Sequence, residues 1–168
     1  TFMKTKPIFP LVLSMALPMT ISMLVNALYN IVDSYFVAQI SEDAMTALSL
    51  VYPIQNIVTS VTVGFGIGIN VLVAFYLGAK NQKAANNATS LGLLCNIFHG
   101  ILLTIICIST IKLYLGLFTD NANVISNGLT YSYIVFAFSI PIAISISFEK
   151  IFQAVGQMKV SMICMILG

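Results

Sequence analysis

The stretch AMTALSLVYPIQNIVTSVTVGFGIGINVLVAFYLGA, at positions 44–79, decides the class of fold. It contains no Asp, Glu, Lys, Arg or His, and a helix needs only about 20 mainly apolar residues to cross the hydrocarbon core of a bilayer. Dividing the stretch into two spans would place Lys80 and Lys83 on the outer side of the membrane, against the lysine bias of the chain. We therefore expect one long, tilted transmembrane helix here.

The composition of the whole chain supports a membrane protein. Of its 168 residues, 59% are hydrophobic and only 7% are charged, whereas soluble domains carry about 25% charged residues. A net charge of +2 is too small for a nucleic-acid-binding protein, and the apolar composition excludes disorder. The three cysteines form no Cys-x-x-Cys pair, so we expect neither a disulfide framework nor a zinc site.

The remaining charges separate further apolar runs. We expect four complete spans and the beginning of a fifth, at about 8–40, 45–78, 84–111, 122–148 and 160–168. The last segment rises only about 13 Å and cannot cross a bilayer. The sequence therefore predicts an all-α, polytopic transmembrane helix bundle that is the amino-terminal part of a longer protein.

Lysine positions predict the orientation, because short cytoplasmic loops retain positive residues. With the amino terminus in the cytoplasm, Lys112 is the one lysine at the outer face. The six others lie on the cytoplasmic side: Lys4, Lys6, Lys80, Lys83, Lys150 and Lys159. We expect a multi-pass protein of the cell membrane with no cleaved signal peptide.

Asp33 interrupts the first predicted span. An acid at the centre of a transmembrane helix costs about 2.5–3.5 kcal/mol on the insertion scale, and such residues are functional sites by default. Asp33 precedes Ser41, where the span ends, by about 12 Å along the helix axis, which places it in the outer half of the membrane. Desolvation favours its protonated form, whereas a bound cation would favour the carboxylate. A structural hydrogen bond between helices is the remaining alternative.

Polar residues share one helical face with Asp33. Ser22, Asn26 and Tyr29 precede it at helical spacing, and Asn30 lies one turn away. The second span offers a comparable polar face, made by Gln55, Thr59, Thr62, Gly66 and Asn70. We predict that Asp33 exchanges a proton or another small cation, with support from Asn26, Tyr29, Asn30 and Asn70.

Prolines and glycines mark irregular helix positions. Pro18, Pro53 and Pro141 lie inside predicted spans, where each removes a backbone donor and favours a kink. Pro18 and Pro141 are our hinge candidates, although ordinary transmembrane prolines are the simpler interpretation. The Gly-x-x-x-Gly pair of Gly64 and Gly68 allows close helix approach.

No enzyme motif and no cofactor-binding motif occurs in the sequence. His99 has Cys95 and Asn96 one turn before it, which resembles a metal face only superficially. With no further ligand nearby, we expect a hydrogen-bonded packing histidine and no metal site.

Four segments in the correct order resemble the multidrug and toxic compound extrusion (MATE) transporters. The first runs from Ala16-Leu17-Pro18 to Leu28-Tyr29-Asn30-Ile31-Val32-Asp33-Ser34-Tyr35-Phe36-Val37. The others are Gly78-Ala79-Lys80, Leu117-Phe118-Thr119-Asp120, and Phe152-Gln153-Ala154-Val155-Gly156-Gln157-Met158-Lys159. Together they cover essentially the whole chain.

This resemblance implies a protein of twelve helices in two lobes that exports organic, often cationic, drugs against an inward flow of protons or Na⁺. Asp33 stands where the family has its first-helix acid, implicated in cation coupling. The implied partners are the lipid bilayer, small organic or cationic substrates and the remaining helices of the transporter. Flippases of lipid-linked sugars or lipids share the superfamily fold, and a membrane scaffold or receptor-like bundle without transport is the alternative from another class.

Overall fold

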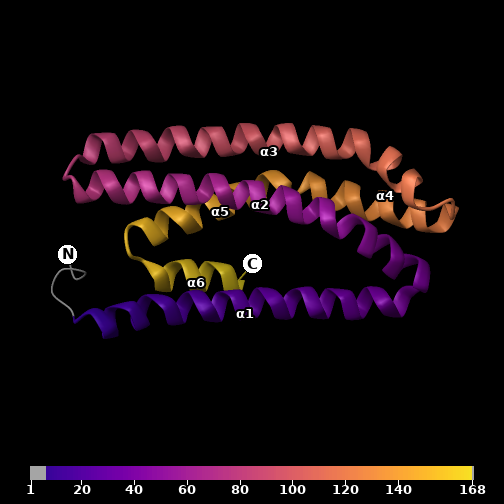
Figure 1. Ribbon diagram of the computed structural model, residues 1–168, viewed down its shortest axis with the longest axis horizontal. Coiled ribbons are helices and arrows are strands. Elements are labelled where there is room, and N and C mark those ends of the chain that lie inside the picture. The colour runs from indigo at the N-terminus through magenta and orange to yellow at the C-terminus, as the bar shows by residue number, and fades with distance from the viewer. Residues whose placement is uncertain (1–6, 168) are drawn as a thin grey trace.

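The computed structural model describes residues 7–167, all of whose regular elements are helices (Figure 1). In chain order they are α1 (Ile8–Ile40), α2 (Glu42–Gly78), α3 (Gln82–Phe118), α4 (Ala122–Ala137), α5 (Ser139–Ala154) and α6 (Met158–Leu167). The predicted all-α bundle is confirmed. Short turns connect antiparallel neighbours, and Ser41 and Asn81 cap α2 and α3 by accepting hydrogen bonds from the backbone N–H groups of Ala44 and Ala84.

Three helices are long and apolar enough to cross a membrane, namely α1, α2 and α3. The pair α4 and α5 passes the same criterion together, with a bend of 44° between them. The expected single second span is thus one helix, Glu42–Gly78. The third helix differs from the expected 84–111 because it continues past Lys112 to Phe118; a lysine near a span end keeps its charge in water while its helix continues.

The bend between α4 and α5 lies at Phe138, three residues before Pro141. Proline has no N–H for the carbonyl of Ala137, and its ring crowds that carbonyl, so the helix breaks in the preceding turn. The expected fourth span, 122–148, is therefore two helical segments, and the second continues to Ala154. Pro18 and Pro53 cause no such break, since α1 and α2 run through them.

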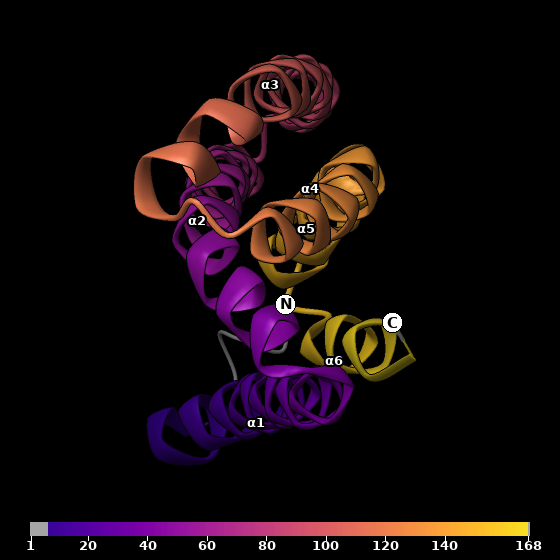
Figure 2. The same cartoon turned by 90° about the vertical axis from the view of Figure 1, so that its right-hand side faces the viewer.

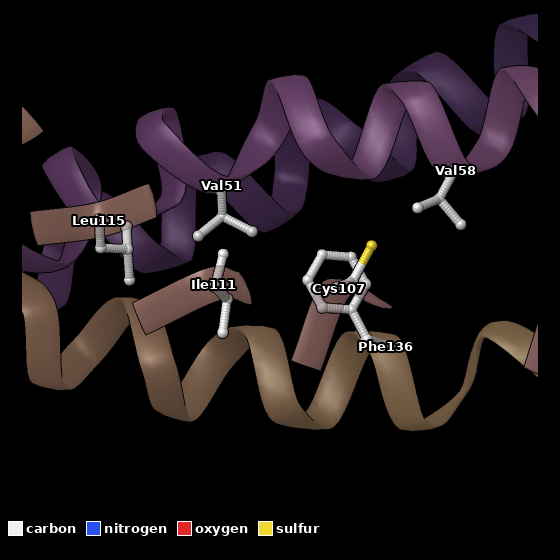
Figure 3. Packing of buried hydrophobic residues seen from close by; sticks show 6 residues of the cluster. All are labelled: Val51, Val58, Cys107, Ile111, Leu115 and Phe136. Atoms are coloured by element: carbon white, nitrogen blue, oxygen red, sulfur yellow. The ribbon is translucent and has the colours of Figure 1, made fainter. Parts of the chain in front are cut away.

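Helix α2 occupies the centre of the bundle, with α3 on one side and α1 on the other (Figure 2). An apolar cluster fills the space between α2, α3 and α4 (Figure 3). It consists of Val51, Val58, Cys107, Ile111, Leu115 and Phe136, each at most 8% exposed. The cluster packs α4 against α2. This packing sets which side chains of α4 face α1.

Polar contacts join α5 to the same core. Asn96 of α3 is 1% exposed and donates to Ser147 Oγ at 2.6 Å and to the Ala143 carbonyl at 3.2 Å, both in α5. Asn70 of α2 donates to the Lys150 carbonyl at 2.8 Å. Buried amides of this kind position helices because an unpaired partner is costly in an apolar interior.

Gly66, rather than the pair formed by Gly64 and Gly68, provides the close approach of α2 to α5. A Cβ added at Gly66 would lie 2.9 Å from Lys150 Cγ and 3.3 Å from Ile146 Cγ2. Among the described residues, nothing lies within 4 Å of a Cβ added at Gly64 or Gly68. The spacing of the pair is right for helix packing, yet helix rotation turns its face away from α5.

Helix α1 is the least buried long helix. Of the described residues of α1, only Pro18 and Ser22 are buried. It contacts α6 and part of α2, and Figures 1 and 2 show it at the edge of the bundle. Its polar face is consequently accessible along much of its length.

Candidate ion-binding site

Asp33 lines a pocket of about 490 Å³ between α1, α2 and α4. Helix α1 contributes Asn30 and Ser34 beside Asp33, while α2 contributes Gln55 and α4 contributes Tyr131. Ser49 and Tyr52 of α2 add further hydroxyls to the wall. The pocket thus gathers one carboxylate with amide and hydroxyl oxygens, the ligand types that suit a hard cation.

The Asp33 carboxylate is exposed and has no salt-bridge partner among residues 7–166. Tyr131 donates a long hydrogen bond to Gln55 Oε1 at 3.4 Å and lines the same pocket as Asp33. No cationic side chain neutralises the acid within the described chain.

The other predicted residues of α1 divide between two neighbours. Asn30 lines the pocket and donates from Nδ2 to the Asn26 carbonyl at 3.0 Å and to Asn26 Oδ1 at 3.1 Å. Asn26 is therefore linked to the pocket through Asn30. Tyr29 instead donates its hydroxyl to the Ile166 carbonyl of α6 at 2.9 Å, so it ties α1 to α6.

Asn70 lies apart from Asp33, although the sequence grouped it with the ion site. It is fifteen positions, or about 22 Å of helix, beyond Gln55, and its amide binds the backbone of α5. Within this polar face of α2, Gln55 lines the Asp33 pocket, whereas Gly66 packs against α5.

Tyr131 is one of the polar pocket residues that sequence reasoning missed, together with Ser34, Ser49 and Tyr52. It belongs to a span with several aromatic residues, and no spacing rule relates it to Asp33 a hundred positions earlier. Gln55 offered the usable signal, because a glutamine within an apolar span needs polar partners. Tyr131 is one such partner.

A second charged group lies where α5 approaches α2 and α6. Lys150 Nζ and Glu149 Oε1 are 3.0 Å apart, with side chains only 16% and 15% exposed. Gln153 donates to Glu149 Oε1 at 2.7 Å and to Ser161 Oγ of α6 at 3.3 Å. Unlike Asp33, Glu149 is therefore neutralised by the chain itself.

His99 packs against an aromatic ring. Its imidazole centroid lies 4.7 Å from that of Phe65, with planes 35° apart, and its Nε2 is buried without a hydrogen-bond partner among the described residues. Within residues 7–167 no group of three or more His, Cys, Asp or Glu side chains could hold a metal ion. The packing of His99 differs from the expectation because its Nε2 lacks the expected hydrogen bond.

Residues 18–168 match the MatE family. The chain belongs to the MatE family. The multidrug export protein MepA of Staphylococcus aureus (strain NCTC 8325 / PS 47) is 26% identical over 169 residues, covering 98% of this chain and 37% of that protein. The chain therefore spans little more than a third of the length of MepA.

Two solved MatE-like structures share the fold. One is a MOP superfamily transporter from Pyrococcus furiosus, and the other is an outward-facing multidrug resistance MATE family transporter; each has a TM-score of 0.88 and 22% identity. Both cover 94% of this chain and 35% of the solved chain. With its apolar helices, the family membership identifies a multi-pass membrane protein.

Proposed function

We propose that this MatE chain is the amino-terminal part of a cation-coupled antiporter that exports organic or cationic drugs by alternating access. The observation that carries the proposal is the Asp33 carboxylate, unpaired among the described residues and set in a pocket of polar oxygens. An acid without an internal counter-charge in an apolar bundle gains most from binding a proton or Na⁺. The relative MepA, named a multidrug export protein, supports drug export as the linked process.

The proposed cycle uses the pocket as an exchange point. Asp33 binds the incoming ion, and Asn30 with Asn26 behind it orients oxygen atoms toward that ion. Ion occupancy changes how α1 packs on α2 and α6, with Pro18 and the bend before Pro141 as the hinges. The cytoplasmic amino terminus expected from the lysine bias places Asp33 in the outer half of the membrane, where ions enter.

The energetics suit one ion per cycle for a neutral substrate. One charge moving through 100 mV supplies about 2.3 kcal/mol, and each tenfold gradient requires about 1.4 kcal/mol. One ion can thus sustain roughly a 50-fold substrate gradient. A monovalent cationic drug exported one-for-one cancels the electrical contribution, leaving only the concentration gradient of the ion.

The test is Asp33→Asn in the full-length protein, reconstituted into vesicles with an imposed proton or Na⁺ gradient. Asparagine keeps the size of the side chain and cannot bind a proton or pair with a cation. We expect ion-dependent efflux of a fluorescent organic cation to fall to the level of empty vesicles, at unchanged expression. Asp120→Asn is the matched control, because Asp120 is an exposed acid outside the helices.

Undiminished efflux by the Asp33→Asn protein would overturn the role of Asp33. Absence of dye efflux from the wild-type protein, together with gradient-independent movement of a lipid-linked sugar or lipid, would identify a flippase. Absence of any transport would identify a scaffold or receptor-like bundle.

A further inference from the structure

A long apolar groove lies between the second half of α2 and the first half of α3. One end of it is nearest the α2–α3 turn, which Figure 1 shows at the end of the molecule opposite the α1–α2 turn. Its volume is about 750 Å³, within the range of sites that hold small molecules. Most of its wall is aliphatic or aromatic, with Leu72 and Leu91 among the side chains. The groove shares no lining residue with the Asp33 pocket.

Glycines create the groove. Gly64 and Gly68 line it, and a Cβ at either position would meet nothing within 4 Å among the described residues. Gly92 of α3 lies against Ile69 of α2, where a side chain on Gly92 would collide. The two helices therefore touch along the floor, while missing side chains leave the space above it open.

One end of the groove lies near the α2–α3 turn, which carries two lysines that do not line the groove themselves. Tyr76 and Asn87 line its end nearest the α2–α3 turn, and Lys80 and Lys83 lie exposed in and beside that turn. Neither lysine forms a salt bridge within the described part of the chain. Lys80 has the left-handed backbone conformation, φ 58°, which is unfavourable for a residue with a Cβ. Two positive charges without a salt-bridge partner in the described chain therefore lie in and beside the turn, next to the groove end that Tyr76 and Asn87 line.

The length of the groove fits one acyl chain of a lipid. From Tyr76 to Gly64 the groove follows α2 for twelve residues, or about 18 Å, while the hydrocarbon of one leaflet is about 15 Å deep. A tyrosine and snorkelling lysines are the side chains expected at the level of lipid headgroups. The polar end of the groove therefore lies at headgroup level when the apolar part lies in the leaflet.

We propose that this groove binds an anionic phospholipid, with one acyl chain between α2 and α3 and the phosphate beside Lys80 and Lys83. Basic pockets between transmembrane helices bind acidic headgroups in this manner. The positive charges beside this end disfavour an organic cation, which separates this site from the transported drugs of the proposed function. The inference requires only that the helices span a membrane, so it stands independently of the coupling mechanism.

The experiment uses the full-length protein in nanodiscs that contain a phosphatidylglycerol carrying a photoreactive acyl chain. After illumination, labelled peptides are mapped by mass spectrometry. We expect labels within 64–76 and 84–95, and loss of these labels when unlabelled phosphatidylglycerol, but not phosphatidylcholine, is added in excess. The readout is lipid labelling, so it does not depend on transport activity.

Two variants separate the chain site from the headgroup site. Gly68→Leu fills the groove without a backbone clash, and we expect labelling to fall at least tenfold. Lys80→Gln with Lys83→Gln removes both positive charges at the exposed turn, and we expect roughly a 30-fold loss, about fivefold for each lysine. The matched controls keep wild-type labelling: Gly116→Leu, at an equally open glycine of α3 outside the groove, and Lys112→Gln with Lys159→Gln.

Equal labelling of wild-type protein and both variants would overturn the proposal, as would equal competition by phosphatidylcholine. Absence of labels from 64–76 and 84–95 in the wild-type protein would also overturn it, and would assign the groove to downstream helices of the transporter. In that case Gly68→Leu would destabilise the full-length protein, whereas Gly116→Leu would not.

Discussion

Asp33 and Glu149 are two acids within the helices of one bundle, and their surroundings are opposite. Glu149 pairs with Lys150 at 3.0 Å, accepts from Gln153 at 2.7 Å and is only 15% exposed. Asp33 is exposed in a polar pocket and lacks a salt-bridge partner within residues 7–166. The chain neutralises one acid and leaves the other without a cationic partner among the described residues.

The helices that carry the two acids also differ in how tightly they are packed. Glu149 lies on α5, which Asn96, Asn70 and Gly66 hold against α2 and α3. Asp33 lies on α1, which has two buried residues in the described chain. A tightly packed ion pair stabilises an arrangement, whereas a loosely packed helix with an unpaired acid suits a change between arrangements.

The largest predicted difference follows from neutralising each acid in the full-length protein. Asp33→Asn should reduce the substrate gradient that one ion sustains at 100 mV from roughly 50-fold to none, with an unchanged thermal unfolding midpoint. Glu149→Gln should lower that midpoint and preserve ion-dependent transport. Efflux from vesicles measures ion-dependent transport, and thermal unfolding in detergent measures the unfolding midpoint. The contrast between the two acids would be contradicted if Glu149→Gln abolished ion-dependent transport while Asp33→Asn preserved it.

Removing the cation of the pair sharpens the structural half of the comparison. Lys150→Met leaves the Glu149 charge unpaired, which costs about 3–5 kcal/mol for a fully buried pair. Because both side chains keep some exposure, we expect about 2–3 kcal/mol. Adding Glu149→Gln should recover most of the unfolding midpoint, since the uncompensated charge disappears. No recovery in the double variant would mean that packing of Lys150, rather than its charge, is what stabilises α5.

Removal of the buried Asn96 amide of α3 should have the next largest effect on the free energy of unfolding. Asn96→Ala removes the donor to Ser147 and leaves a cavity, at an expected cost of about 2 kcal/mol in unfolding free energy. Thr110→Ala is the matched control in the same helix, because Thr110 is exposed and binds only its own helix backbone; its effect should stay within about 0.5 kcal/mol. Equal unfolding midpoints for the two variants would contradict the role of Asn96.

The smallest predicted effect concerns two glycines of α2. Gly66→Ala places a Cβ 2.9 Å from Lys150 Cγ, and the flexible lysine chain can shift, so we expect destabilisation below about 1 kcal/mol. Gly68→Ala meets open space and should be neutral or slightly stabilising, since alanine favours helices more than glycine. A reversed order of the two unfolding midpoints would show that α2 packs on α5 through another face.

The sequence predicts the helices better than their contacts. Charge spacing was sufficient for α1 and α2, and Pro141 marked the bend between α4 and α5. Helix faces that meet depend on rotation and side-chain volume over the whole bundle, which local patterns do not contain. For that reason Asn70 binds α5 instead of joining Asp33, and no spacing rule predicts that Tyr131 lines the pocket. Asp33 itself was visible because its cost in an apolar span is local.

The hydrogen bond from Tyr29 to Ile166 spans 137 positions of the chain. A ribosome adds about 5–20 residues per second, so roughly 7–27 seconds pass between synthesis of the donor and of its acceptor. During that interval the nascent first helix enters the bilayer without its α6 partner. A further polar residue on α1 would therefore act first on membrane insertion during translation, and only later on the assembled bundle.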